Sequence, residues 1–228
     1  MSGDPQSHGS PGTRSTVAPL SSACAVFVHA ILAGQRKEAL AVAREALRQG
    51  NSVADVYVHI FQEALYEVGR RWESGQVSVA DEHMATASVQ YVIAQFYPEL
   101  PLSAERRGHA VITGVQGEFH QVGANIVADL LEADGWSVRF LGTNMPHRDI
   151  VAAVTETPTD LFGISVTMLF NLPQVRALVL EVRDKLGSRA PRIVVGGGAF
   201  KLCDSFCAEL NVEGPAADVR AAVELCAA

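Results

Sequence analysis

The sequence predicts an α/β chain in two parts, a four-helix bundle followed by a flavodoxin-like (Rossmann-type) unit with a five-stranded parallel sheet. Up to about Tyr97, apolar residues recur at three- and four-residue spacing, which is typical of packed helices. From about His109, short apolar runs alternate with helical segments, which is typical of strands joined by crossover helices. Residues 98–108 contain prolines and charges and are the predicted linker. The helical part is therefore expected over residues 18–97, and the α/β part over residues 109–228.

The helical part begins after residues 1–17, which hold mostly Ser, Gly, Pro and Thr and are predicted to be a disordered tail. Ser78 is expected to cap the last helix, with Asp81 in a capping-box position. Helices joined by such short loops form a bundle. The expected helices end near residue 34 for the first and cover about 35–50, 53–73 and 79–96 for the others.

The α/β part alternates between the two kinds of element. Strands are expected over residues 109–115, 138–141, 161–166 and 193–195 and near 211–212. Helices are expected over residues 122–134, 148–155, 172–186 and about 216–226. In a flavodoxin-like sheet, ligands bind beyond the carboxyl ends of the strands.

Composition excludes several classes of function. The formal net charge is −7, and Lys and Arg are scattered along the chain, so we expect no direct DNA binding. The four Cys form no Cys-x-x-Cys pair, which favours free thiols in a reducing cytoplasm. The apolar stretch near residues 17–34 contains Pro and Ser and runs into a helical pattern, so we expect a bundle helix there. We expect no membrane span.

Three short motifs fall where strands are expected to end. The chain reads His120-Gln121-Val122-Gly123, then 41 residues, Ser165-Val166-Thr167, then 28 residues and Gly196-Gly197. Because the carboxyl ends of parallel strands meet at one edge of a sheet, we expect the imidazole, the two hydroxyls and the glycine pair at one surface.

At these separations the motifs resemble the signature of the cobalamin-binding domain, Asp-x-His-x-x-Gly, Ser-x-Leu and Gly-Gly. The resemblance covers about residues 108–228. Glu118 stands where Asp is usual, and Thr167 stands where Leu is usual. Neutral imidazole is a good cobalt ligand, and a carboxylate bonded to its other nitrogen fixes the tautomer. Glu118, two residues before His120, is placed for that task.

The resemblance implies a role for each motif. His120 would be the lower cobalt ligand and would displace the cofactor's own benzimidazole. The displaced nucleotide tail would enter a slot lined by Gly123, Gly196 and Gly197, where glycine permits close backbone approach. Ser165 would hydrogen-bond the displaced base, with Thr167 nearby.

A fourth motif lies in the helical part, where nine residues separate Trp72 from Glu82-His83. A helix-loop-helix hairpin brings these side chains together, where they could stack on a flat ligand and hydrogen-bond its hydroxyls. The alternative is a core Trp72 and a Glu82 favoured by the helix dipole. Trp-x9-Glu-His resembles the cap of adenosylcobalamin-dependent photoreceptors of the CarH repressor type, over about residues 20–228. The resemblance implies an adenosyl group under the cap and a light-sensitive cobalt–carbon bond.

Two departures from that photoreceptor family matter. Its members carry a DNA-binding domain ahead of the cap, and here we expect only the short tail. They also place a His just after the Trp, where this chain has Glu73.

The predicted function is that of a light-sensing regulatory protein, without enzyme activity, that binds adenosylcobalamin. It would signal to a regulatory protein or enzyme partner, or through a homo-oligomer, with a dimer expected. AerR-type antirepressors and photocobilins resemble this build, and photocobilins add a bilin. No Cys lies in a recognisable attachment motif, which leaves only a non-covalent biliverdin open. A corrinoid methyl carrier and, more weakly, the small subunit of a carbon-skeleton mutase are the alternatives.

Overall fold

The computed structural model describes residues 20–202, 204–216 and 218–227, so the predicted disordered tail lies outside the described residues. The helical region contains α1 (Leu20–Leu32), α2 (Arg36–Arg48), α3 (Val53–Val56), the π-helical turn η1 (Tyr57–Gln62), α4 (Glu63–Glu73) and α5 (Val79–Phe96). A 3₁₀ turn, η2 (Tyr97–Glu99), follows. The predicted third helix is one continuous helical run from α3 to α4, and its middle is the π turn.

Capping boxes start two of these helices. The Ser78 side chain accepts a hydrogen bond from the backbone N–H of Asp81, and the Asp81 carboxylate accepts one from the N–H of Ser78, as the sequence predicts. Ser52 and Asp55 do the same at the start of α3. Each box satisfies two backbone N–H groups that a helix start leaves without a partner.

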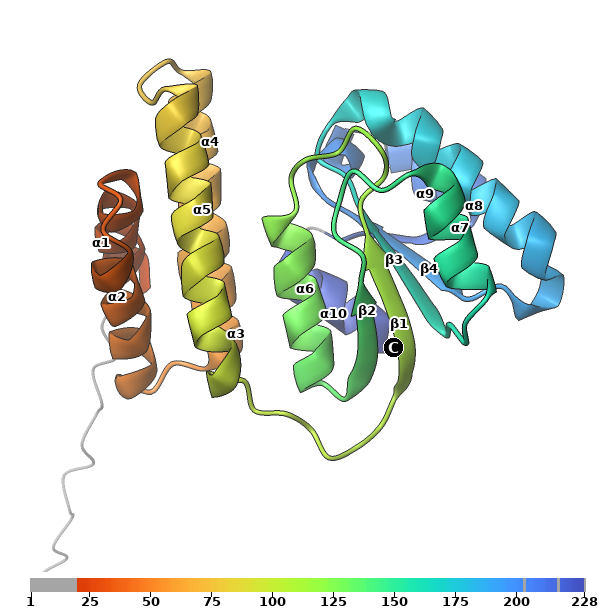
Figure 1. Ribbon diagram of the computed structural model, residues 1–228, viewed down its shortest axis with the longest axis horizontal. Coiled ribbons are helices and arrows are strands. Elements are labelled where there is room, and N and C mark those ends of the chain that lie inside the picture. Colours follow the sequence, from red (N-terminus) through yellow and green to blue (C-terminus); the bar gives the residue numbers. More distant parts are fainter. Residues whose placement is uncertain (1–19, 203, 217, 228) are drawn as a thin grey trace, which may run out of the picture.

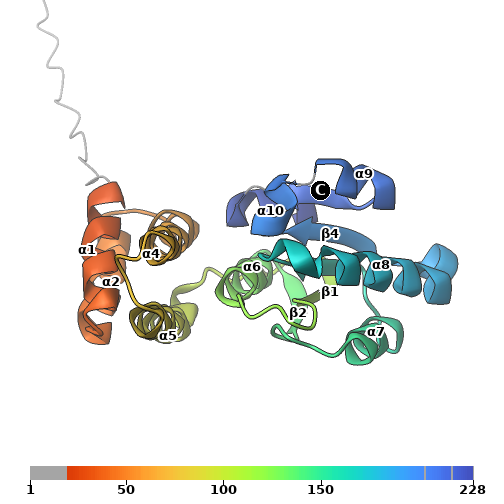
Figure 2. The same cartoon turned by 90° about the horizontal axis from the view of Figure 1, so that it is seen from above.

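The α/β region contains one parallel sheet whose strands follow the order β2-β1-β3-β4-β5, which confirms the predicted flavodoxin-like sheet (Figure 1). The strands are β1 (Gly108–Thr113), β2 (Trp136–Phe140), β3 (Leu161–Ser165), β4 (Arg192–Gly196) and β5 (Glu213–Ala216). Helices α6 (Val122–Ala133) and α10 (Val219–Ala227) cover one face, and α7 (His147–Thr155), α8 (Leu172–Leu186) and α9 (Asp204–Leu210) cover the other (Figure 2). The α/β region also contains the short 3₁₀ turns η3 (Leu169–Asn171), η4 (Gly187–Arg189) and η5 (Gly198–Leu202).

The end of the chain departs from the prediction. Helix α9 was not expected, and the last strand lies at Glu213–Ala216 instead of near Asn211-Val212. The strand contains Pro215, which lacks an N–H and is tolerated because β5 is an edge strand. Gly214 and Pro215 are turn-type residues, so the apolar pattern typical of strands does not indicate this one.

The helical region packs against α6, so one hydrophobic cluster joins both parts of the chain. Val122, Ile126 and Leu130 of α6 belong to the same buried cluster as Phe61 and Phe96 of the helical region. Two buried hydrogen bonds join the helical region to the sheet domain, one through α6 and one through α10. The Tyr57 hydroxyl donates to Asp129 at 3.0 Å, and the backbone N–H of Val219 donates to the Gln62 side chain at 2.9 Å. The sheet domain is therefore held beside the helices along α6 (Figure 1).

Among the described residues, no helix is both long enough and apolar enough to cross a membrane.

Candidate functional site

A buried carboxylate organises the loops at the carboxyl edge of the sheet. The side chain of Glu118 is fully buried. Its Oε1 accepts a hydrogen bond from the backbone N–H of His120 at 3.0 Å. Its Oε2 accepts from the N–H groups of Thr167 at 2.8 Å and Met168 at 3.2 Å, and from the side-chain amide of Asn171 at 3.2 Å. Glu118 therefore ties the loop after β1 to the loop after β3.

The same carboxylate orients the His120 ring. Nδ1 of His120 lies 2.5 Å from Oε1 of Glu118, and a carboxylate only accepts, so Nδ1 carries the proton that is shared. The other ring nitrogen, Nε2, is then free to bind a ligand. The His120 side chain is 56% exposed while Glu118 is completely buried. This is the arrangement that metal-binding histidines use, with the imidazole at the surface and the carboxylate behind it.

The pair shifts both pKa values. Burial alone would raise the pKa of Glu118, but hydrogen bonds from the His120 ring and from three backbone N–H groups outweigh it and lower the pKa to about 2. The hydrogen bond to Glu118 raises the pKa of His120 above its ordinary value of 6.5, against an opposing effect of burial. Glu118 is therefore ionised at every physiological pH, and His120 carries its proton at higher pH than a free histidine.

This shift predicts a pH dependence for cobalt binding. Cobalt can bind Nε2 only when that nitrogen carries no proton. Because the pKa of His120 is raised above 6.5, protons begin to compete with cobalt for Nε2 at a pH above 6.5. We expect the affinity for cobalamin to fall by about tenfold per pH unit below that pKa. In Glu118→Gln the midpoint should move down towards 6.5. Titration of the apoprotein with cobalamin at a series of pH values measures it, and a flat profile would contradict His120 as ligand.

The stability of the apoprotein should depend on pH in the opposite direction to the cobalamin affinity. The pair stabilises the fold while His120 is protonated, so its contribution is present below the unfolded pKa and is lost as pH rises through the raised one.

The predicted glycines differ in what surrounds them. Gly197 has φ +104°, and a Cβ there would lie 2.4 Å from the carbonyl oxygen of Val166, so the loop after β4 needs glycine for its own packing. At Gly196, a Cβ would meet only the Cβ of Ala216, at 3.4 Å. Gly123 is exposed in the first turn of α6, and a Cβ there would meet nothing within 4 Å. Of the three, Gly123 is the one where an added Cβ would have no neighbour within 4 Å.

The two hydroxyl residues lie at the end of β3. Ser165 is the last residue of the strand, half-buried and in register with Gly196. Thr167, expected near the displaced base, contributes its backbone N–H to Glu118. The structure thus brings His120, Glu118, Ser165 and the glycines to one edge of the sheet.

The loops around His120 expose apolar side chains. Phe119 is 72% exposed and Phe170 is 67% exposed, and Met168 and Leu169 are also exposed. Exposed apolar groups gathered at one place mark a binding surface. A corrin ring is broad, flat and largely apolar on its faces, so the residues present fit a corrinoid whose cobalt binds His120. Sequence reasoning missed these four side chains and Asn171. Met168, Leu169 and Phe170 could have been found as the apolar run directly after the Ser165 motif, and Phe119 as the aromatic neighbour of His120.

The predicted cap residues lie at the end of the α4–α5 hairpin. Trp72 is 48% exposed, so the alternative that it is a core anchor is wrong. Oε2 of Glu82 lies 2.5 Å from Nδ1 of His83, and Oε1 accepts a hydrogen bond from the Thr86 hydroxyl at 2.8 Å. The charge of Glu82 also contributes to the raised pKa of His120. The cap acid and the imidazole therefore lie within electrostatic range of each other.

Protein ligands alone do not form a metal cage here, because no group of three or more His, Cys, Asp or Glu among the described residues could hold an ion. A site with one protein nitrogen suits a metal that a macrocycle already holds.

An exposed imidazole that a buried carboxylate orients at the carboxyl edge of a parallel sheet fits a protein of the corrinoid-binding class. Comparison with known families agrees with this class. One family model described as a B12 binding domain matches residues 108–224, and another with the same description matches residues 24–97. The chain therefore belongs to the B12-binding domain family.

Named relatives fall into two groups. The chain is 24% identical to the corrinoid protein DSY3155 of Desulfitobacterium hafniense, over 86% of this chain and 92% of the relative. It is 30% identical to the HTH-type transcriptional repressor CarH of Myxococcus xanthus, over 65% of this chain and 48% of the repressor, so it spans about half of that protein. Among solved structures, the Methanosarcina barkeri monomethylamine corrinoid protein shares the fold, with a TM-score of 0.75 at 18% identity, over 88% of this chain and 94% of that chain.

Proposed function

We propose that this protein is a light-sensing regulator that binds adenosylcobalamin between His120 and the cap formed by Trp72, Glu82 and His83. The observation that carries the proposal is the exposed Trp72 near the end of α4 together with the Glu82–His83 pair at the start of α5, because the charge of Glu82 acts on His120. A binding site for a nucleoside needs an aromatic surface and hydrogen-bond acceptors, and Trp72 and Glu82 supply these.

Each cap residue has a task in that proposal. Trp72 presents a ring on which the adenine can stack. The Glu82 carboxylate, held by His83 and Thr86, accepts hydrogen bonds from the ribose hydroxyls. When bound, adenosylcobalamin supplies a cobalt–carbon bond that visible light breaks. Loss of the adenosyl group would remove the ligand of the cap and free the hairpin to move against the sheet domain.

The signal would pass to a protein partner or through a homo-oligomer, and the dimer is the assembly that we propose. Glu73 stands where the resembling photoreceptors place a His. We therefore propose that, after illumination, His83 takes the place of that missing cap histidine. A bound biliverdin is part of the same proposal and would be non-covalent.

A corrinoid methyl carrier is the second candidate. It is supported by the corrinoid protein of Desulfitobacterium hafniense, which matches a larger share of this chain and of its own length than CarH does. Methyl carriers also resemble this chain in combining a helical cap with a lower histidine. A methyl group needs no nucleoside pocket, and that difference makes the two candidates separable.

The test is a comparison of holoprotein in darkness and after illumination. We expect tighter binding of adenosylcobalamin than of methylcobalamin, a change of absorption spectrum in light, and a shift in size-exclusion elution or partner affinity. A visible band beyond those of cobalamin would reveal a bilin. Equal binding of both cobalamins with no light-dependent change, together with methylation by a methyltransferase, would favour the carrier.

Trp72→Ala should reduce the selectivity for adenosylcobalamin without abolishing corrin binding. We expect the preference for adenosylcobalamin over methylcobalamin to fall by about tenfold, since one base stacked on an aromatic ring contributes about 1–3 kcal/mol. Corrin binding itself should persist because the residues around His120 are unchanged. Tyr66→Ala, which removes another half-exposed aromatic ring from α4, is the matched control and should keep the preference. Equal loss in both variants would indicate a general effect on the helix.

A further inference from the structure

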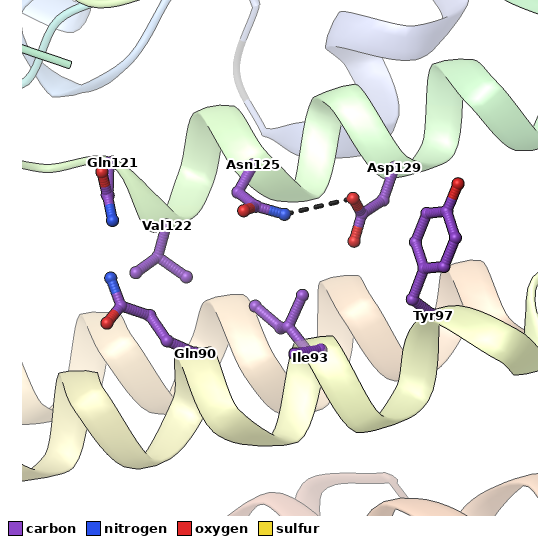
Figure 3. A pocket seen from close by; sticks show the side chains of 8 residues that line it. Gln90, Ile93, Tyr97, Gln121, Val122, Asn125 and Asp129 are labelled. Atoms are coloured by element: carbon purple, nitrogen blue, oxygen red, sulfur yellow. Dashed lines mark hydrogen bonds between the residues drawn. The ribbon is translucent and has the colours of Figure 1, made fainter. Parts of the chain in front are cut away.

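A cavity of about 340 Å³ lies between α5 and α6, beside the His120 loop (Figure 3). Side chains with carboxamide, carboxylate or hydroxyl groups form most of its polar lining. The lining residues are Gln90, Ile93, Ala94 and Tyr97 on one side and Gln121, Val122, Asn125 and Asp129 on the other. A cavity of this size lies at the lower end of the range for small-ligand sites and is too small for a macrocycle.

Two carboxamides in this cavity make no hydrogen bond to any residue that the structure describes. Figure 3 shows the side chains of Gln90 and Gln121 pointing toward one another from the two helices. Within the described residues, neither side chain makes a hydrogen bond, although each offers two N–H donors and an oxygen acceptor. Asn125 uses one N–H to bind Asp129 and keeps the rest of its amide. The cavity therefore has a surplus of amide groups.

The cavity lies next to the proposed corrin site. Gln121 follows His120 directly, so one end of the cavity lies beside the proposed cobalt ligand. Glu82 and Gln90 are eight residues apart on the same face of α5, a distance of about 12 Å along the helix. That length is comparable to the breadth of a corrin ring. A ring in front of His120 would have one edge near Gln121, which lines the same cavity as Gln90.

The far end of the cavity is acidic. Asp129 is 8% exposed, and it accepts hydrogen bonds from Tyr57 at 3.0 Å and from Asn125 at 3.1 Å. Burial raises its pKa to about 6; the hydrogen bond from Tyr57 opposes this rise, and the nearby charge of Glu132 adds to it. At pH 8 Asp129 is therefore a carboxylate, which attracts N–H donors and repels other carboxylates.

We propose that this cavity is a subsite for the carboxamide side chains at one edge of the corrin, and that Gln90, Gln121, Asn125 and Asp129 select the amidated ring. The inference rests on the proposed placement of the corrin in front of His120. Each carboxamide of the ligand can donate to Asp129 or to a glutamine oxygen and accept from a glutamine N–H. A carboxylate at the same place has no N–H to donate, and it faces the charge of Asp129.

The subsite should therefore distinguish a completely amidated corrin from one that carries a free carboxylic acid. A buried polar group left without its partner costs about 1–3 kcal/mol, which corresponds to about 5- to 150-fold in affinity. Corrinoids that carry a free acid at the edge facing α5 and α6 should be rejected by that factor. Acids at other edges should be accepted, because their positions lie away from the cavity.

The experiment measures binding of cyanocobalamin and of its b-, d- and e-monocarboxylic acids to the complete chain at pH 8. We expect one of the acids to bind at least about tenfold more weakly than cyanocobalamin, and the others to bind within about threefold of it. Asp129→Asn should restore most of the lost affinity for the rejected acid, since it removes the opposing charge and keeps a partner for Tyr57. Gln90→Leu should weaken cyanocobalamin and reduce the discrimination.

Gln49→Leu, at the end of α2 and outside the cavity, is the matched control and should bind all four ligands as the wild type does. Far-ultraviolet circular dichroism checks that each variant is folded. Equal binding of the four corrinoids to the wild type would overturn the subsite and leave cobalamin binding intact. Discrimination that persists unchanged in both Gln90→Leu and Asp129→Asn would also overturn it. Failure of cyanocobalamin itself to bind would overturn the corrin site and the subsite together.

Discussion

Replacing His120 with Ala is expected to lower the affinity for cobalamin by about 100-fold or more. Changes to residues behind a metal ligand typically cost about 10- to 100-fold, and removal of the ligand itself should exceed that range. The variant loses the only nitrogen that Glu118 holds at 2.5 Å, while the loop contacts of Glu118 to Thr167, Met168 and Asn171 remain. The fold should therefore persist while the cofactor is lost. Titration of apoprotein with cobalamin, followed by absorption, measures the effect.

A spectroscopic measurement separates a ligand from a mere neighbour. Electron paramagnetic resonance of the cobalt(II) form should show coupling to one nitrogen nucleus, and the coupling should change when histidine is labelled with ¹⁵N. In His120→Ala any remaining coupling should no longer respond to the label. His147→Ala is the matched control, because His147 also pairs with a carboxylate, Glu181, at 2.8 Å but lies on α7. Unchanged affinity and an unchanged spectrum in His120→Ala would remove it as the ligand.

Glu118→Gln should have a smaller effect of the same kind, about 10- to 100-fold in affinity. Gln keeps the shape of the side chain and one acceptor oxygen, but it loses the charge that raises the pKa of His120. It also places an N–H donor against the N–H groups of Thr167 and Met168. We therefore expect reduced stability of the two loops as well.

Much of the fold could be predicted because its signals are local. The apolar periodicity of the helices, the capping box at Ser78 and the short buried strands each depend on neighbouring residues. The alternation of strands with helices indicated a parallel sheet, and the number of strands suited the flavodoxin-like order that the structure shows. Helix α9 and strand β5 were missed because their residues show neither period clearly, and Pro215 weakens the strand pattern.

The site was predictable only in part, for a similar reason. His120 and Glu118 are two residues apart, so their pairing could be expected from the chain itself. Asn171 reaches the same carboxylate from 53 residues away, and no local pattern indicates that contact. The cavity between α5 and α6 depends on how the helical region packs against the sheet domain, which periodicity does not define.

The second large effect is expected at Gly197, where a valine should destabilise the protein by about 3 kcal/mol or more. Strained backbone conformations and overpacked contacts each cost about 1–3 kcal/mol. Both apply here, since φ is +104° and the new Cβ would lie 2.4 Å from the Val166 carbonyl oxygen. That oxygen also accepts the N–H of Ala199, so the clash would separate the loop from β3. Urea unfolding of the apoprotein measures the loss of stability. If this variant also loses the cofactor, the cause would be the destabilised fold and not a blocked nucleotide slot.

Gly123→Ala is the substitution that tests the slot without that damage, because it should move stability and affinity in opposite directions. A helical glycine changed to alanine gains up to about 1 kcal/mol, and here the methyl group meets nothing within 4 Å. The apoprotein should therefore become slightly more stable in urea. If the open space beside Gly123 receives the nucleotide tail, cobalamin should bind more weakly, and cobinamide, which lacks the tail, should bind as to the wild type. Equal weakening for both ligands, or for neither, would exclude Gly123 from the slot and leave the tail to another face of α6.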